Sequence, residues 1–413
     1  MTANKCIQKL LRFKGLKVVD FVFEGSRRLI ILVKPHKNGC LCPVCGRRCE
    51  IVWTLPEVRW WRDIPAAGWE VWLQYCPREI RCPTHGRRQE EIPWARSHAR
   101  ATYRYEYLML RYCQMMPQNG AGTLLHTPSS TLSDLLHRCI TATRDGHKIR
   151  GLKRIGIDEI SYAKGHKYAT LVYDLDRSCV VWVGPGKGRA AIDVFFNEVL
   201  SDYQKGQIQI GCCDMSQAYM GAITEHCPNA TLVLDRFHVV KALNAAVDDV
   251  RKEQWRLTTG ADRKALKGLR WLLYRHSSTR SRKDTETLRA LDKANRRIYR
   301  AWQLKDEFEQ FWEYKAPWAA ERFIRQWMTS VLRSRLEPMR KFVNTLREHY
   351  DGVLAFVGCR LTNAIAEGLN RIVKIVKNRA SGFRNLDAFT DMIFLTVGDV
   401  DIPAQIPARF RTL

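Results

Sequence analysis

A repeated five-residue motif constrains the fold of this chain more than any other feature of its sequence. The residues CPVCG at 42–46 return as CPTHG at 82–86, with proline and glycine at matching places. Two ligands separated by two residues are presented to a metal ion by one tight turn, and the glycine lets the backbone bend around the ion. Two such turns supply four tetrahedral ligands, which predicts one zinc ion bound by Cys42, Cys45, Cys82 and His85.

The zinc ion is expected to be structural, because four protein ligands leave no coordination position open for chemistry. The alternative is a set of buried reduced thiols without metal. Cys40, Cys49 and Cys76 lie close by in the sequence, and each could replace one of the four ligands. The 14 cysteines are spaced unevenly, and the first residues lack the apolar core of a signal peptide. Reduced cytoplasmic thiols therefore fit better than a secreted disulfide scaffold.

The charge of the chain predicts a polyanionic partner. Its 413 residues include 68 Lys and Arg against 42 Asp and Glu, a formal net charge of +26. Nucleic acid is the first expectation, and an anionic membrane surface is the second. No apolar run approaches the roughly 20 residues that a membrane-spanning helix needs, so no membrane partner is expected. With 46% apolar residues the chain can bury sizeable cores, and its length predicts more than one domain.

The order of apolar patterns predicts a multidomain α+β protein. Up to residue 95, short apolar runs alternate with Cys, Pro and Gly, which is typical of small strands around a metal. From residue 154, three strand patterns follow one another in hairpin order, and helices then alternate with further strands. Residues 239–358 are almost entirely helical and basic in pattern. The strand order predicts a mixed α/β sheet, for which the RNase H-like fold is an analogy.

The residues before that sheet have the pattern of a helix-turn-helix. A first helix is predicted at 102–116, a short second helix at 120–125, and a third that begins after a turn at 127–130. The third helix has apolar residues at the spacing of one buried face, namely Leu132, Leu135, Leu136, Cys139 and Ile140. Four polar side chains are then left to contact a DNA groove, namely Ser129, Thr131, Ser133 and His137. A plain helical hairpin that links two domains is the alternative.

Two carboxylates stand at the ends of buried strand patterns. Asp158 follows residues 154–157, and Asp214 follows residues 208–213. A carboxylate at such a place costs desolvation energy unless a metal ion or hydrogen bonds compensate it. Either one alone could simply cap the helix that follows its strand. Two of them on strands that would be neighbours in an RNase H-like sheet favour a shared metal site.

The third candidate carboxylate, Glu367, lies in an amphipathic helix predicted at residues 362–380. At 100° per residue, four apolar residues fall within about 80° of Ile365, namely Leu369, Ile372, Val373 and Val376. The opposite face carries the polar residues Glu367, Arg371, Lys374 and Asn378. One interpretation is a metal-binding carboxylate flanked by side chains that contact DNA phosphates. The other is a surface ion pair between Glu367 and Arg371, four residues further on.

These motifs together resemble the ISL-three group of DDE insertion-sequence transposases. The resemblance is carried by GIDEIS at residues 156–161, by the run at 234–251 that begins LDRFH, and by the run at 362–385 that begins TNAIAEGLN. It implies that Asp158, Asp214 and Glu367 form the catalytic DDE triad. Asp235 and His238 match a D-x2-H element that would support the site. Since Asp235 also follows a strand, it is a rival for the second carboxylate.

The resemblance also implies how the chain is divided into domains. The expected units are a zinc-ribbon DNA-binding domain at 1–95, a helix-turn-helix at 96–150, an RNase H-like catalytic domain in two parts at 151–238 and 359–413, and an all-helical insertion domain at 239–358.

The implied function is that of a transposase that binds the terminal inverted repeats of an insertion sequence, then cleaves and joins DNA. A carboxylate triad supports phosphoryl transfer with two Mg²⁺ ions, for which Mn²⁺ is expected to substitute, beside the one structural Zn²⁺. The partners would be transposon-end DNA, target DNA and a second copy of the chain on paired ends, in the bacterial cytoplasm at the nucleoid. Two rival functions are a junction-resolving nuclease on the same fold and a DNA-binding regulator descended from a transposase.

Overall fold

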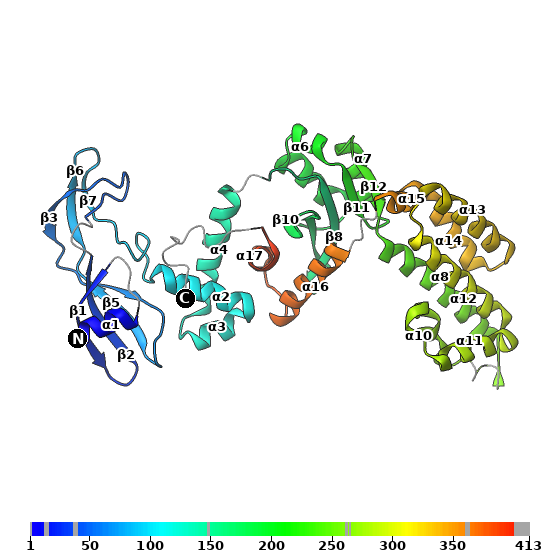
Figure 1. Ribbon diagram of the computed structural model, residues 1–413, viewed down its shortest axis with the longest axis horizontal. Helices are drawn as coiled ribbons and strands as arrows, with labels where there is room; N and C mark the ends of the chain where they lie inside the picture. The colour runs from blue at the N-terminus through cyan, green and yellow to red at the C-terminus, as the bar shows by residue number, and fades with distance from the viewer. Residues whose placement is uncertain are drawn as a thin grey trace.

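The computed structural model describes residues 2–11, 16–35, 40–146, 149–260, 263, 266–359 and 364–399, without the side chains of 144–146 and 364. Figure 1 shows an elongated molecule in which a β-rich N-terminal part, a central sheet and a helical bundle follow one another. This mixture of sheets and helices agrees with the predicted multidomain α+β class. Within those ranges, no helix is long and apolar enough to cross a membrane.

The predicted strands of the N-terminal part form two separate sheets. The first has the order β1 (Leu16–Glu24), β2 (Arg28–Pro35), β5 (Glu70–Tyr75) and β4 (Arg59–Arg62), with α1 (Ala3–Leu10) beside β1. Its own core includes the fully buried Trp61 and Trp94, whose ring centroids lie 5.6 Å apart. Because this sheet has its own apolar core, it does not depend on the metal-binding motifs for its packing.

The second sheet lies at the repeated motifs. It consists of β3 (Glu50–Thr54), β6 (Arg78–Cys82) and β7 (Gly86–Gln89), all antiparallel. The turn between β6 and β7 is the second motif itself. The buried core of this sheet is a small cluster of Cys40, Cys42, Ile80 and Cys82.

Three helices follow at the positions predicted for a helix-turn-helix: α2 (Tyr103–Met115), α3 (Gln118–Leu124) and α4 (Ser129–Gly146). All five apolar residues predicted for the inner face of α4 are buried, which confirms that face. These helices share one continuous hydrophobic core with the central sheet. Much of that contact runs through α17 (Leu386–Val397), whose Leu395 carbonyl accepts a hydrogen bond from the Gln114 side chain at 2.8 Å.

The central sheet is mixed, as predicted. Its order is β10 (Cys179–Pro185), β9 (Lys167–Asp174), β8 (Arg154–Ala163), β11 (Ile210–Cys213) and β12 (Thr231–Leu234). The first three strands are antiparallel in hairpin sequence, whereas β11 pairs parallel with both β8 and β12. The connections contain α5 (Arg189–Val194), the π-helix η1 (Phe195–Val199), α6 (Asp202–Gln207) and α7 (Gln217–His226).

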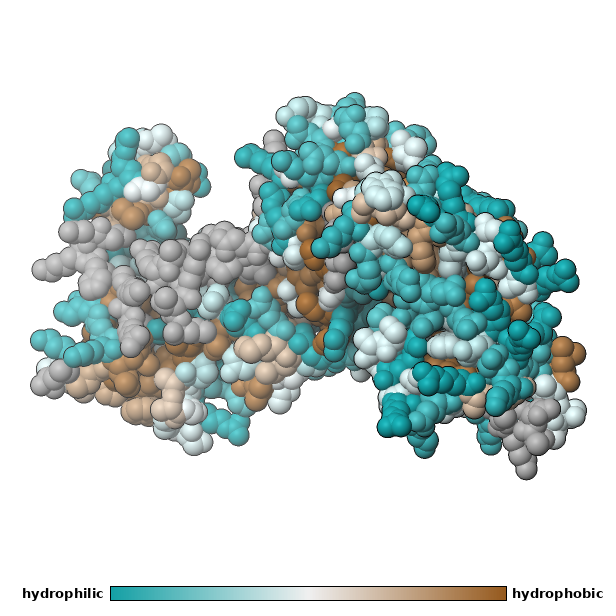
Figure 2. Space-filling view, turned by 45° about the vertical axis from the view of Figure 1, so that its right-hand side comes forward, coloured by the Kyte–Doolittle hydropathy of each residue, from teal (hydrophilic) through white to brown (hydrophobic). Residues whose placement is uncertain are grey.

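The region predicted to be helical forms a bundle that leaves the sheet after β12 and returns to it. It comprises α8 (Arg236–Leu257), α10 (Leu269–Tyr274), η2 (Ser277–Thr279), α11 (Arg282–Ala294), α12 (Arg296–Phe308), η3 (Glu309–Glu313), α13 (Pro317–Arg333), α14 (Glu337–Glu348) and α15 (Tyr350–Cys359). It begins three residues earlier than predicted, because Asp235 caps α8. Helix α15 packs on β12, where a Cβ at Gly352 would lie 2.9 Å from Leu234. Most of the face of the bundle visible in Figure 2 is hydrophilic.

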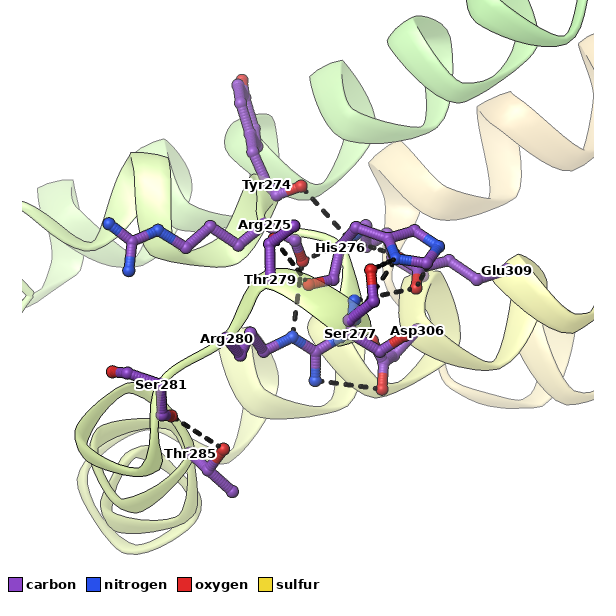
Figure 3. Close-up of polar contacts among 12 residues, drawn as sticks. Tyr274, Arg275, His276, Ser277, Thr279, Arg280, Ser281, Thr285, Asp306 and Glu309 are labelled. Atoms are coloured by element: carbon purple, nitrogen blue, oxygen red, sulfur yellow. Dashed lines mark hydrogen bonds and ion pairs between the residues drawn. The ribbon is translucent and has the colours of Figure 1, made fainter.

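A polar network holds the turn between α10 and α11 against α12 (Figure 3). The ammonium group of Lys305, a residue only 2% exposed, pairs with Glu309 at 2.7 Å and donates to the Arg275 carbonyl at 3.1 Å. Arg280 pairs with Asp306 on the same helix. The turn is therefore tied to the helix bundle by charged groups at both of its ends.

The last two described helices, α16 (Ala364–Arg379) and α17, pack against β8 and against α4. Thr362 and Asn363, the first residues of the helix predicted here, lie outside the described residues. The predicted apolar face of α16 is partly wrong. Leu369, Val373 and Val376 are buried, but Ile372 is 38% exposed and Asn370 is buried in its place. The helix is turned this way because Asn370 has polar partners beneath it, as described below.

Candidate active site and metal-binding motifs

Asp158 lies in the middle of β8 and faces α16. Residues two apart in a strand point to the same side, and a Cβ at Gly156 would lie 3.6 Å from Ala366 of α16. The Asp158 carboxylate accepts a hydrogen bond from the Glu159 backbone N–H at 2.7 Å and another from the Asn370 side chain. Burial raises the pKa of Asp158, and the charges of Asp214 and Asp235 act in the same direction.

Asp214 follows β11, the strand next to β8. The parallel register pairs Cys212 with Gly156, and its continuation by two residues places Asp214 level with Asp158. Its carboxylate accepts the Ser216 backbone N–H at 3.0 Å, and the side chain is half-buried. The two carboxylates predicted from separate strand patterns are therefore neighbours on adjacent strands.

Asp235 follows β12, one strand further from Asp158. It is 2% exposed and caps α8 by accepting the Phe237 backbone N–H at 3.0 Å. Its second oxygen lies 2.8 Å from Nδ1 of His238. This hydrogen bond raises the pKa of His238, and the charges of Asp235, Asp214 and Asp158 add to the effect. Both oxygens of Asp235 are thus engaged, by a helix cap and by a histidine, whereas the hydrogen bond of Asp214 involves one of its oxygens.

Glu367 lies in the first turn of α16 with an exposed side chain. Desolvation raises the pKa of its carboxyl group, and the charges of Asp235 and Asp158 act in the same direction. Glu367 is thus in the electrostatic field of Asp235 and Asp158, whereas His238 and Arg236 act in the opposite direction. In the part of the chain that the structure describes, no Lys or Arg forms an ion pair with Asp158, Asp214 or Glu367. The surface ion pair between Glu367 and Arg371, considered above, is absent from these described residues.

Asn370 and Tyr173 belong to the site and were missed by the sequence analysis. Asn370 is 7% exposed and donates to Asp158, while its amide oxygen accepts from the hydroxyl of the fully buried Tyr173. The available signal was an asparagine one helical turn after Glu367. It was not recognised because the angular positions calculated for residues 362–380 placed only apolar residues on the buried face.

The four predicted zinc ligands come together. Cys42, Cys45, Cys82 and His85 bring one ligand atom each to within 4.8 Å of one another, and no other group of three or more His, Cys, Asp or Glu among the described residues does so. The Sγ atoms of Cys45 and Cys82 lie 3.8 Å apart, and Nδ1 of His85 lies 3.6 Å from the Cys82 sulfur. A tetrahedron with zinc–sulfur bonds of about 2.3 Å has sulfur–sulfur edges of about 3.8 Å. The donor set and its spacing therefore fit zinc.

The local backbone explains how the motifs form this cluster. Gly46 and Gly86 have φ of 66° and 71°, the left-handed conformation that glycine adopts without strain. A hydrogen bond from the backbone of Cys45 lowers the pKa of the Cys42 thiol, which favours the thiolate that a metal binds. Cys40 instead points to Glu90 at 3.6 Å and Cys49 to the Arg47 carbonyl at 3.3 Å, and neither belongs to the four-ligand group.

The side chains predicted to contact DNA lie in two places. Ser129, Thr131 and His137 are exposed on α4 and Ser133 is half-buried, but His137 lies 2.9 Å from the Asp391 carboxylate on α17. Arg371, Lys374 and Asn378 are exposed along α16, on the same face as Glu367.

Comparison with known proteins defines the class. A family model described as a transposase, of the DDE type and the ISL3 (ISL-three) group, matches residues 155–393, which include Asp158, Asp214 and Glu367. The transposase for insertion sequence element IS1001 of Bordetella parapertussis is 30% identical over 380 residues, 91% of this chain and 93% of that protein. The transposase for IS1557 of Mycobacterium tuberculosis is 26% identical over 414 residues, 93% of each chain. The chain belongs to the ISL3 group of DDE transposases.

Proposed function

We propose that this protein binds the terminal inverted repeats of an insertion sequence and catalyses metal-dependent DNA cleavage and strand transfer. The proposal is supported by three carboxylates that are far apart in the sequence but stand on neighbouring elements: Asp158 on β8, Asp214 after the adjacent strand β11, and Glu367 on α16, which packs on β8. Their oxygens do not form a group as close as that of the zinc ligands. Because the chain belongs to a transposase family, the reaction proposed for these carboxylates is the cleavage and joining of DNA. We propose that it acts on DNA in the bacterial cytoplasm, at the nucleoid.

The central domain is proposed to be RNase H-like. Three antiparallel strands in hairpin order, followed by two parallel strands on the other side of the first, support this fold. The helical bundle would then be an insertion between β12 and α16, and the catalytic residues lie on both sides of it in the sequence. Such an insertion, with its hydrophilic surface (Figure 2), is proposed to hold DNA by phosphate contacts, which position DNA without reading its sequence.

Asp158, Asp214 and Glu367 are proposed to hold two Mg²⁺ ions, with Mn²⁺ as a substitute. Hard carboxylate oxygens suit these ions, and in the described part of the chain none of the three acidic groups forms an ion pair with a Lys or Arg. When bound, two such ions assist the attack on a phosphate and stabilise the charge on the leaving oxygen. Asn370 would hold the Asp158 carboxylate in one orientation, and the Asp235–His238 pair would fix the start of α8 beside it.

The polar face of α16 is proposed to contact the DNA backbone next to the cleaved bond. Arg371 and Lys374 are one and two helical turns beyond Glu367 on the exposed face. Guanidinium and ammonium groups at those places would bind successive phosphates on one side of the reacting one. Asn378 extends the same face by a further turn.

Incubation of the whole protein with Mg²⁺ and DNA carrying the element's own terminal repeats tests this function. Cleavage at the ends followed by joining to target DNA is the expected result. A homodimer is expected on paired ends, because each chain has one triad and two ends require two strand transfers, so the joined complex should contain at least two chains. Cleavage without joining would instead indicate a nuclease, and binding without cleavage a regulator.

Recognition of the terminal repeats is proposed to involve the exposed side of α4 together with the zinc-binding segment. We expect a Thr131→Ala, Ser133→Ala variant to lose part of its preference for terminal-repeat DNA over random DNA, by about fivefold or more, since one base contact contributes about 1 to 3 kcal/mol of discrimination. Competition binding measures this preference. The whole chain is required, because α2–α4 share a core with α17 and a fragment of residues 1–150 would expose that face.

A matched control for this variant is Thr329→Ala. Thr329 is an exposed threonine on α13 whose hydroxyl donates to the Arg325 carbonyl of its own helix at 3.0 Å. It should keep the full preference for terminal-repeat DNA. An unchanged preference in the α4 variant would assign end recognition to another surface.

A further inference from the structure

A groove lies between three parts of the chain, one from the predicted helix-turn-helix and two from the predicted catalytic domain. Its volume is about 1240 Å³, and its walls come from the start of α4 with the start of α3, the β8–β9 turn, and the turn between α16 and α17. The polar residues that line it include Ser129, Lys164, Lys377, Asn378, Arg384 and Asn385. Ser129 and Asn378 were predicted to contact DNA on separate grounds, and the structure brings them to this one groove.

The positive charge of this groove is uncompensated. No Asp or Glu lines it, and Lys164, Lys377 and Arg384 form no ion pair with any carboxylate in the described ranges. A second groove of about 770 Å³, between β4 and α4, contains five arginines, but the carboxylates Glu106 and Asp134 also line it and three of the arginines are paired. Arg62 lies 3.3 Å from Glu70, and Arg96 lies 2.5 Å from Glu106. A concave surface lined by cations and by no carboxylate attracts an anion, and the carboxylates that line the second groove distinguish it from the first.

The groove is built on a rigid turn and has an aromatic floor. Backbone N–H groups of Ser381 and Gly382 donate to the carbonyls of Asn378 and Lys377, both at 3.0 Å, which closes the end of α16. Gly382 has a φ of 96°, a conformation that favours glycine. Tyr162 and Phe383 line the groove and pack against the fully buried Phe389, with ring centroids 6.0 and 4.9 Å away. The cations of the groove suit the phosphates of a DNA strand, and the packed rings anchor its wall to the hydrophobic core.

Helix α16 connects this groove to the candidate active site. Asn378 lies 11 residues beyond Glu367, which is about 16 Å along a helix that rises 1.5 Å per residue. The exposed face between them carries Arg371 and Lys374. A DNA duplex whose axis ran parallel to this face would cover the distance with about five base pairs, at about 3.4 Å each along the axis.

We propose that this groove, here called the α16 groove, holds the backbone of the transposon-end DNA about five nucleotides from the cleaved phosphate. Lys164, Lys377 and Arg384 contact its phosphates, and Ser129 and Asn378 donate hydrogen bonds to the same segment. The transposon side is assigned, rather than the flanking DNA, because the other wall of the groove begins α4, whose exposed face is proposed to recognise the end. The inference rests on the proposed function and adds the place where the bound end enters the catalytic domain.

Phosphate-ethylation interference with the full-length protein and a terminal-repeat duplex tests the inference. Binding is measured in Mg²⁺-free buffer, so that the readout does not depend on cleavage. Ethylation about four to six nucleotides inside the end should weaken binding of the unaltered protein. The interference should disappear in a Lys164→Ala, Lys377→Ala, Arg384→Ala variant. For the triple variant, the slope of the logarithm of the binding constant against the logarithm of the salt concentration should also be shallower by about three. Each lost phosphate contact lowers this slope by about one.

The matched control is Lys153→Ala, which removes one charge at the opposite end of β8 from Lys164. Lys153 is also exposed, and its interference pattern and salt slope should equal those of the unaltered protein. Lys164→Glu, in an exposed turn, serves as a second variant if the triple variant has a lowered melting temperature. Interference confined to flanking DNA, or an unchanged pattern in folded variants, would overturn the inference. If the interference pattern is as expected but the protein does not cleave DNA in Mg²⁺, the proposed chemistry is wrong and the α16 groove still binds the transposon end.

Discussion

Asp158→Asn, Asp214→Asn and Glu367→Gln should each reduce DNA cleavage and strand transfer by orders of magnitude while terminal-repeat binding persists. Each change keeps the size of the side chain and, at position 158, an oxygen that can accept from Asn370. It removes one negative charge from the carboxylate set proposed to hold two divalent ions, so an ion should be lost. Residues that act as one unit are not additive, so double variants should be little worse than single ones. Gel assays of cleavage, joining and binding measure the three quantities.

Asp235→Asn is the matched control for the second carboxylate. We expect a smaller loss of activity, accompanied by a lower melting temperature, because the neutral amide weakens the pair with His238. The cap of α8 should remain, since the side-chain oxygen of Asn accepts the Phe237 N–H about as well as that of Asp. A folded Asp235→Asn protein without strand transfer, beside an active Asp214→Asn protein, would show that the triad contains Asp235 instead.

Purified protein should contain one zinc ion per chain, and a Cys42→Ser, Cys82→Ser variant should lose both the zinc and the fold of β3, β6 and β7. The buried core of this sheet is Cys40, Cys42, Ile80 and Cys82, so two of its four residues are proposed metal ligands. A core this small cannot stabilise a sheet without the metal, whose binding free energy becomes folding free energy. Metal analysis and limited proteolysis between residues 40 and 90 measure the two effects, and end binding should fall with them.

Cys49→Ser and Cys76→Ser are the controls for the choice of ligands. Both residues are half-buried and lie outside the four-ligand group. These variants should keep one zinc ion and the melting temperature of the unaltered protein. A Cys42→Ser, Cys82→Ser protein that retained zinc, or unaltered protein without it, would refute the site.

Local chemistry made much of this protein predictable from its sequence. The two CPxC/H-G motifs predicted four residues that do come together, because a two-residue spacing and a glycine turn determine the arrangement within each motif. The spacing of Leu132, Leu135, Leu136, Cys139 and Ile140 predicted the buried face of α4, because helical periodicity alone places them on one side. Asp158 and Asp214 could be found because each directly follows a buried apolar run, where a carboxylate is costly unless it has a function.

Contacts between distant parts of the chain decided what periodicity could not. The angular positions calculated for α16 placed Ile372 on its buried face. The helix is instead turned so that Asn370 is buried. Its hydrogen-bond partners there are Tyr173 and Asp158, and Asp158 lies 212 residues earlier in the sequence. Periodicity defines which residues share a face, but the neighbour that the face meets depends on tertiary packing. For the same reason the sequence could place Ser129 and Asn378 on exposed helix faces, whereas only the packing of α4 and α16 around α17 brings them into one groove with unpaired cations.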